Sequence, residues 1–163
     1  MQKTPRRILG IDPGFGRVGV GIIEERGREW VAVYYGCIQT DPKKLFIERL
    51  LEIHNTLTKI ITQHKPAFAA VEELFFYKNV TTAIQVGQAR GVILLTLAQA
   101  GIVTHEFTPL EIKQTITGYG RAEKSQIQKM VRVLLHLDKK AIQDDAADAL
   151  AVALTGATRI IDK

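Results

Sequence analysis

Hydrophobic positions alternate with polar or small residues in the first forty positions of the chain. The alternating runs cover residues 8–11, 18–22 and 30–38, and an Asp-Pro-Gly turn sequence follows the first of them. Alternation with a period of two is typical of half-buried strands, and glycine-containing turns between such runs favour hairpins. The pattern predicts three successive antiparallel strands.

A helical period replaces this alternation in most of the remaining chain. Apolar residues recur at helical spacing after Pro42, over about 80–100, after Pro109, over 127–135 and from Asp144 to about Leu154. Two short apolar runs at 68–71 and 102–107 interrupt these helices and predict buried strands. The order predicts an α/β fold: a five-stranded mixed sheet with helices on both faces, in a single domain spanning 1–163.

Net charge, cysteine content and the length of apolar runs indicate the class of partner and the compartment to expect. A formal net charge of +5 favours anionic partners, nucleic acid first. The single cysteine, Cys37, cannot form an internal disulfide, and its apolar surroundings predict a small buried side chain. The chain shows no signal-peptide pattern, and its most apolar run, residues 91–102, is too short to span a bilayer. We therefore expect a cytoplasmic protein without a membrane partner.

Four acidic residues fall where separate elements can bring them together. Asp12 ends the first predicted strand, Glu72 ends the fourth, and Asp145 and Asp148 lie three apart on the last helix, so they share a face. Carboxylate oxygens are the ligands that Mg²⁺ prefers, with phosphate and water completing the shell. The pattern predicts a magnesium site for phosphodiester cleavage, since paired metal ions serve that chemistry.

Each acid also has a structural interpretation, and two assignments stay open. Aspartate commonly opens a turn, and acids at a strand end or a helix start are common as solvated or capping groups. Asp148 is the exception, because it lies among alanines on a face expected to pack, where an unpaired carboxylate is costly. Strand alternation favours Glu72 over Glu73. Helical spacing does not separate Asp144 from Asp145.

Residues 14–19 match the pattern G-x-G-x-x-G after a strand. In a dinucleotide-binding site a helix begins at this point. Here the following residues alternate with a period of two, so the sequence predicts a strand hairpin and no dinucleotide.

Basic and aromatic residues accompany the acids. Lys113 follows the fifth predicted strand, and a glycine-containing loop carrying Arg121 leads to Lys124 at a helix start. Lysines beside a carboxylate site can hold a scissile phosphate. Phe75 follows Glu72 in a predicted loop at 75–79, where an aromatic ring can stack on unpaired bases or anchor the loop.

Several stretches together resemble the RuvC family of bacterial Holliday-junction resolvases. The matching stretches lie at 8–14, 71–75, 87–91, 113–115, 122–126 and 145–150. The Gly-Gln-Ala-Arg-Gly and Ala-Glu-Lys-Ser-Gln stretches are the most specific of them. The resemblance implies a ribonuclease-H-like fold and a magnesium-dependent endonuclease acting in recombination and repair. It implies symmetric paired nicks in opposing strands of four-way junction DNA, with 5′-phosphate and 3′-hydroxyl ends.

The resemblance also implies roles for individual residues. It makes Asp12, Glu72, Asp145 and Asp148 the catalytic ligands of two Mg²⁺ ions per subunit, for which Mn²⁺ can substitute. It places Lys113, Lys124 and Phe75 on the DNA. It further implies a homodimer formed through the helix that carries the glycines at 87 and 91, and a partnership with the RuvA–RuvB branch-migration complex. Two rivals remain: a nuclease acting on RNA–DNA hybrid, and a junction-binding protein without catalysis.

Overall fold

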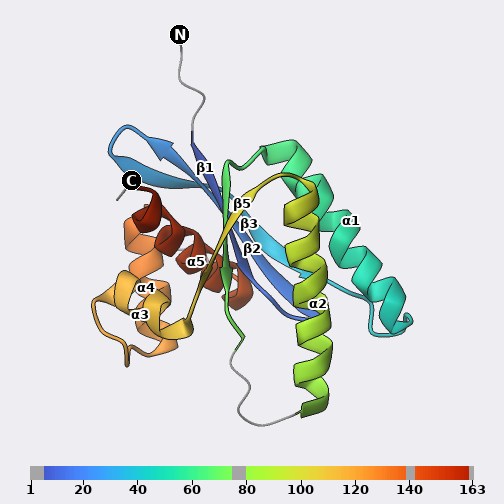
Figure 1. Cartoon of the computed structure of the whole chain (residues 1–163). Helices are drawn as coiled ribbons and strands as arrows, with labels where there is room; N and C mark the ends of the chain where they lie inside the picture. Colours follow the sequence, from blue (N-terminus) through green and yellow to red (C-terminus); the bar gives the residue numbers. More distant parts are fainter. Residues whose placement is uncertain (1–5, 75–79, 139–141, 162–163) are drawn as a thin grey trace.

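A computed structural model describes residues 6–74, 80–138 and 142–161 of the chain (Figure 1). Five strands and five helices follow one another in these segments. In chain order they are β1 (Arg7–Asp12), β2 (Arg17–Arg26), β3 (Glu29–Gln39), α1 (Phe46–His64), β4 (Phe68–Glu72), α2 (Val80–Gln99), β5 (Val103–Phe107), α3 (Pro109–Thr117), α4 (Lys124–Leu134) and α5 (Asp144–Ile161).

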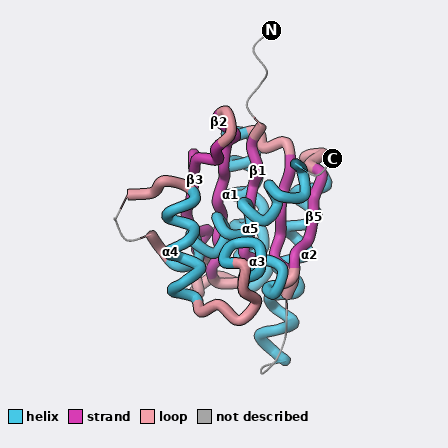
Figure 2. The backbone as a smooth tube through the Cα atoms, turned by 90° about the vertical axis from the view of Figure 1, so that its left-hand side faces the viewer, coloured by secondary structure: helices cyan, strands magenta, loops and turns pink. Residues whose placement is uncertain are grey.

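The strands form one mixed sheet in the order β3-β2-β1-β4-β5. The β1–β2 and β2–β3 pairs are antiparallel, whereas β4 pairs in parallel with β1 on one side and with β5 on the other. Helices α1 and α2 cover one face, and α5 with α3 and α4 covers the other (Figures 1 and 2). The predicted mixed five-stranded sheet with helices on both faces is therefore confirmed.

Each face of the sheet has its own apolar core. On the α5 face, Ile8, Ile23 and Phe107 pack against the buried alanines and leucines of α5 and against α3 and α4. On the other face, Leu9 and Ile11 pack with side chains of α1 and α2. Neighbouring residues of β1 thus point to opposite cores, as strand geometry requires.

Helix α5 lies unusually close to the sheet because glycines face it. A methyl group at Gly10 would overlap the backbone carbonyl oxygen of Ala149, and one at Gly19 would overlap that of Asp145. The helix side of this contact is rich in small residues, so two backbones can approach with no side chain between them. This close packing fixes the beginning of α5 against the ends of β1 and β2.

Two helix boundaries differ from the sequence-based expectation. Helix α1 begins at Phe46 rather than after Pro42, because the Glu48 side chain accepts a hydrogen bond from the Leu45 backbone N–H at 2.8 Å and so caps the helix there. Helix α5 continues to Ile161, beyond the expected end near Leu154. The Thr155 hydroxyl donates to the Ala151 carbonyl at 2.9 Å within the helix, so this polar residue does not end the helix.

Candidate active site

The predicted acids meet at one end of the sheet, where β1 and β4 end and α5 begins. We call this group, Asp12, Glu72, Asp145 and Asp148, the carboxylate edge. Strands β1 and β4 are adjacent and parallel, with Ile11 opposite Val71, so Asp12 and Glu72 leave the sheet side by side. Helix α5 begins at the same edge, and its first turns carry Asp145 and Asp148. The structure therefore brings together residues that are up to 136 positions apart in the chain.

Asp12 lies at the centre of this carboxylate group. Burial, the neighbouring negative charges of Glu72, Asp148 and Asp145, and a hydrogen bond with the Glu72 side chain together raise its pKa to about 8, and burial contributes most. Two carboxyl groups that share a hydrogen bond hold a proton between them. Asp12 is thus protonated at neutral pH when no cation is bound.

Glu72 and Asp148 are perturbed in the same direction. Burial raises the pKa of Glu72, while its hydrogen bond with Asp12 and the positive charges of Lys113 and Lys124 oppose the rise. Burial also raises the pKa of Asp148, against the opposing effect of Lys124. A group of carboxylates held out of water in this way favours a bound cation.

Two predicted lysines lie beside these acids. Lys124 Nζ is 2.9 Å from Asp148 Oδ2 and 3.7 Å from Asp144 Oδ2, and the hydrogen bond with Asp148 raises the lysine's pKa. A cavity of about 270 Å³ is lined by Lys113, Lys124, Glu72 and Asp148 together with apolar side chains. The cavity lining therefore combines two ammonium groups with two of the predicted carboxylates.

Asp145 has a different environment from its neighbour Asp144. The Arg17 Nε donates to Asp145 Oδ2 at 2.7 Å, and the Cys37 Sγ lies 3.7 Å from the same oxygen. Asp144 instead accepts a hydrogen bond from Gln128 Nε2 at 3.0 Å, and its side chain is 67% exposed against 27% for Asp145. The structure therefore separates two residues that spacing did not.

Sequence analysis missed the roles of Arg17 and Cys37. Cys37 is only half-buried, so the expected small buried side chain is wrong. Burial raises the pKa of its thiol, with an opposing hydrogen bond from Arg17. Arg17 is the first residue of β2 and lies within the G-x-G-x-x-G match, where the antiparallel β1–β2 pair confirms the predicted hairpin. No local pattern signals contacts between these strands and α5.

The predicted DNA-binding residue Arg121 does not belong to the cavity lining. It is exposed in the α3–α4 connection. Phe75 lies outside the described residues. Glu73 donates its backbone N–H to the Phe107 carbonyl at 2.8 Å, which extends the β4–β5 pairing past Glu72.

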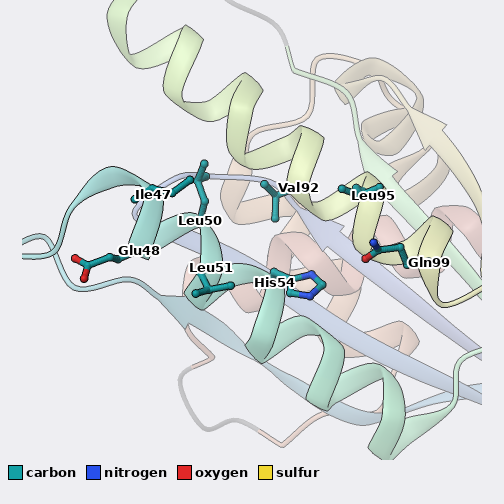
Figure 3. A pocket seen from close by; sticks show the side chains of 8 residues that line it. All are labelled: Ile47, Glu48, Leu50, Leu51, His54, Val92, Leu95 and Gln99. Carbon is teal, nitrogen blue, oxygen red and sulfur yellow. The ribbon is translucent and has the colours of Figure 1, made fainter.

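A second pocket, of about 430 Å³, lies between α1 and α2 (Figure 3). Its lining is largely aliphatic, with Leu50 and Leu51 from α1 and Val92 and Leu95 from α2. His54 Nδ1 lies 2.9 Å from the Thr96 hydroxyl oxygen, which links the two helices. This pocket carries Glu48 as its single acid, so it offers no counterpart of the four-carboxylate edge.

The carboxylate edge fits divalent cations by its chemistry. Its donors are hard oxygens, and their uncompensated charge is held partly out of water. Within the described residues, however, no three acidic, histidine or cysteine side chains converge on one point that could hold an ion. Lys124 and Arg17 occupy two of the carboxylates instead. Each of these contacts involves one of the two oxygens of its carboxylate.

Known proteins resemble the chain over nearly its whole length. Residues 8–156 match the family described as crossover junction endodeoxyribonuclease RuvC. The chain belongs to the RuvC family. RuvC proteins of Petrotoga mobilis and Heliobacterium modesticaldum are each 53% identical to it, covering 90% of this chain and 90% and 91% of their own lengths.

Solved structures agree with this assignment. A Thermus thermophilus RuvC in complex with a Holliday junction substrate is 33% identical, has a TM-score of 0.89, and matches over 95% of this chain and 94% of its own. A yeast mitochondrial Holliday junction resolvase shares the fold at 11% identity and a TM-score of 0.69. As a RuvC family member, the chain is a crossover junction endodeoxyribonuclease, a Holliday-junction resolvase.

Proposed function

We propose that Asp12, Glu72, Asp145 and Asp148 are the catalytic residues of this endonuclease and hold two Mg²⁺ ions, for which Mn²⁺ can substitute. The observation that carries the proposal is the partly buried carboxylate group around Asp12, where burial and the neighbouring negative charges together raise the pKa of Asp12 to about 8. Such pairs of ions, when bound, activate water and stabilise the leaving oxygen of a phosphodiester. The products are nicks with 5′-phosphate and 3′-hydroxyl ends.

In this proposal the carboxylates and the lysines of the chain have separate roles. The four carboxylates hold the cations and exclude excess anions by their charge. Lys113 and Lys124, on the rim of the cavity, bind the scissile phosphate and offset the charge that develops on it. The half-buried position of the acids limits water around the reacting phosphate, which strengthens each of these interactions.

Four-way junction DNA is the proposed substrate. The support is the family assignment and the T. thermophilus relative solved with a Holliday junction. The net charge of +5 suits a DNA ligand. We assign Arg121 to the DNA backbone, since it is exposed next to the helix that begins with Lys124. Phe75 is proposed to stack on unpaired bases.

We further propose a homodimer formed through α2. The helix packs on its own sheet through Ala89, Ile93 and Leu97, and its other side is apolar and exposed: Val80 is 77% exposed and Ile84 59%. The expectation that no apolar run could span a bilayer rested on residues 91–102, whereas the whole 20-residue helix is long and apolar enough to do so by length and composition alone. In a RuvC protein this face suits a second subunit, since closed two-fold pairing covers it.

The dimer is tested by matched substitutions. Ile84→Asp places a charge on the exposed face of α2, and Val133→Asp places one on α4, where Val133 is 60% exposed. In light scattering after size-exclusion chromatography, we expect dimers for the wild type and Val133→Asp and monomers for Ile84→Asp. A dimeric Ile84→Asp protein would assign the interface to another surface.

Family membership supports two further proposals: action in the cytoplasm and partnership with the RuvA–RuvB branch-migration complex. Pull-down of purified RuvA and RuvB assembled on a junction by the tagged wild-type protein tests the second. Failure to bind that assembly would remove the partnership and leave the nuclease assignment intact.

The experiment that tests the catalytic assignment is cleavage of a labelled four-way junction in Mg²⁺, beside a linear duplex and an RNA–DNA hybrid of the same sequence. We expect symmetric paired nicks in the junction alone. Asp148→Asn should abolish cleavage and leave junction binding largely intact, because the change removes one charge and keeps the shape. Comparable cleavage by this variant would contradict the assignment, and cutting of the hybrid would contradict the substrate.

A further inference from the structure

Arg17 forms the shortest ion pair of the carboxylate edge. Its Nε lies 2.7 Å from Asp145 Oδ2, and the Cys37 Sγ contacts the same oxygen at 3.7 Å. Both contacts come from the β2–β3 hairpin and involve one of the two carboxylate oxygens. The side chain of Asp145 is therefore attached to the sheet on the side of β2 and β3.

A second cationic side chain, that of Lys124, pairs with the other proposed ligand on α5, Asp148. Lys124 Nζ lies 2.9 Å from Asp148 Oδ2. Each aspartate of α5 that we assign to metal binding is thus paired with a side chain of the protein, while Asp12 and Glu72 share a hydrogen bond with each other. This pairing accounts for the finding that no three ligand side chains converge within the described residues.

We propose that Arg17 is a positioning residue that holds Asp145 in the metal-free protein and competes with the divalent ion for it. The inference rests on the proposed metal site. The guanidinium at 2.7 Å occupies one of the two oxygens of Asp145, which leaves Oδ1 alone for an ion, and the positive charge of Arg17 repels a divalent ion there. In this proposal, an ion that binds Asp145 through both oxygens displaces Arg17, which then becomes available to a DNA phosphate.

The surroundings of Arg17 permit this displacement. Its side chain is 54% exposed, so it can leave Asp145 without opening a cavity in either core. Lys124 is exposed to the same extent. An arginine needed to build the fold would be expected to lie under other side chains, as the pair between Arg7 and the buried Glu24 does.

The opposite role for Arg17 gives an effect of opposite sign. A hydrogen-bonding partner behind a ligand often orients it and raises metal affinity, so that its loss weakens binding. Under competition, loss of Arg17 tightens binding. The sign of the change in metal affinity therefore separates the two roles, without a measurement of cleavage.

Calorimetric titration of the full chain with Mn²⁺, in the absence of DNA, makes the comparison. We expect Arg17→Gln to tighten Mn²⁺ binding about two- to fivefold at low ionic strength, the size of a partly exposed ion pair. The gain should shrink in high salt because the pair is screened. The matched control is Arg26→Gln, which removes the same charge from the far end of β2, where Arg26 pairs with Glu24; it should leave the affinity unchanged.

The outcomes distinguish this inference from the proposed function. If the wild-type protein binds no Mn²⁺, both are wrong. If it binds and Arg17→Gln binds equally or more weakly, the competition is wrong and the metal site stands. Equal tightening by Arg26→Gln would reduce the effect to net charge and would also overturn the competition.

A measurement on the unmodified protein guards against misfolding of the variant. The Nε–H of Arg17, donating at 2.7 Å, should give a slowly exchanging signal in ¹H–¹⁵N NMR. Saturating Mg²⁺ should abolish that protection, while the Nε–H of Arg7, which donates to Glu24 at 2.8 Å, stays protected. Retention of the Arg17 signal at saturation would overturn the proposal.

Discussion

The two ends of the β1–β2 hairpin hold buried carboxylates in opposite ways. At one end Glu24 is 6% exposed, accepts hydrogen bonds from Arg7 Nε at 2.8 Å and Arg26 Nε at 2.9 Å, and has its pKa lowered, chiefly by the Arg7 bond. At the other end burial, together with the negative charges of Glu72 and Asp148, raises the pKa of Asp12 to about 8.

The difference distinguishes an acid that stabilises the fold, Glu24, from the proposed metal ligand Asp12 on the same hairpin. A carboxylate that serves only the fold is paired with cations supplied by the protein, as Glu24 is. Asp12 lies next to other acids, and this arrangement costs stability unless a cation arrives from solution. A buried acid whose pKa is raised by other acids is therefore the better guide to the site.

Replacing Asp12 gives the largest expected effect. Asp12→Asn should lower junction cleavage by about 10²- to 10³-fold or more, as loss of one essential charged group does. The metal-free stability at pH 8 should stay level or rise, because the amide needs no cation. Cleavage assays and chemical denaturation in EDTA make the two measurements. A large loss of stability would place Asp12 with Glu24 as a structural acid.

Replacing Glu24 should have the reverse result. Glu24→Gln leaves Arg7 and Arg26 without their anion and should lower the free energy of unfolding by about 1–3 kcal/mol. Cleavage by the folded protein at low temperature should be retained. The control is Glu25→Gln on the same strand, whose partner Arg6 is 3.2 Å away and partly exposed, and which should cost less than about 1 kcal/mol. Equal losses in the free energy of unfolding for the two variants would contradict a special structural role for Glu24.

The smallest expected effect is a difference in pH dependence. Folded Asp12 keeps its proton up to about pH 8, whereas the unfolded chain releases it near the ordinary pKa of 3.8, so stability falls as pH rises across that window. The lowered pKa of Glu24 contributes stability that is lost only as the solution becomes more acidic than its ordinary value of 4.5.

Thermal melts in EDTA between pH 5 and 8 measure this difference. The wild-type Tm should fall by a few degrees relative to that of Asp12→Asn, and saturating Mg²⁺ should restore it. Parallel Tm curves for the two proteins would show that Asp12 does not hold its proton in the folded state.

Much of the fold followed from local pattern, whereas the finer structure of the site did not. Alternation and helical spacing predicted all five strands and the helices because those signals are local. The ends of β1 and β4 predicted Asp12 and Glu72. Contacts between Cys37 or Arg17 and Asp145 join segments more than a hundred residues apart, and no periodicity reports them.

The choice between the neighbouring acids Asp144 and Asp145 also depends on packing that local sequence patterns do not report. Spacing alone treated Asp144 and Asp145 alike, since both share a face with Asp148. Their difference arises from the tight contact of α5 with Gly19 of β2, which turns one acid toward the hairpin and leaves the other exposed. That contact is a property of packing between distant elements.

The chain order of α5 has a consequence for synthesis on the ribosome. This helix follows all five strands, and it supplies two of the four acids as well as much of the core on its face of the sheet. A nascent chain that has emerged only as far as α4 holds two of the four proposed ligands, and one face of its sheet lacks α5. If the four acids bind the metal ions as proposed, cleavage of DNA begins only after α5 has been translated.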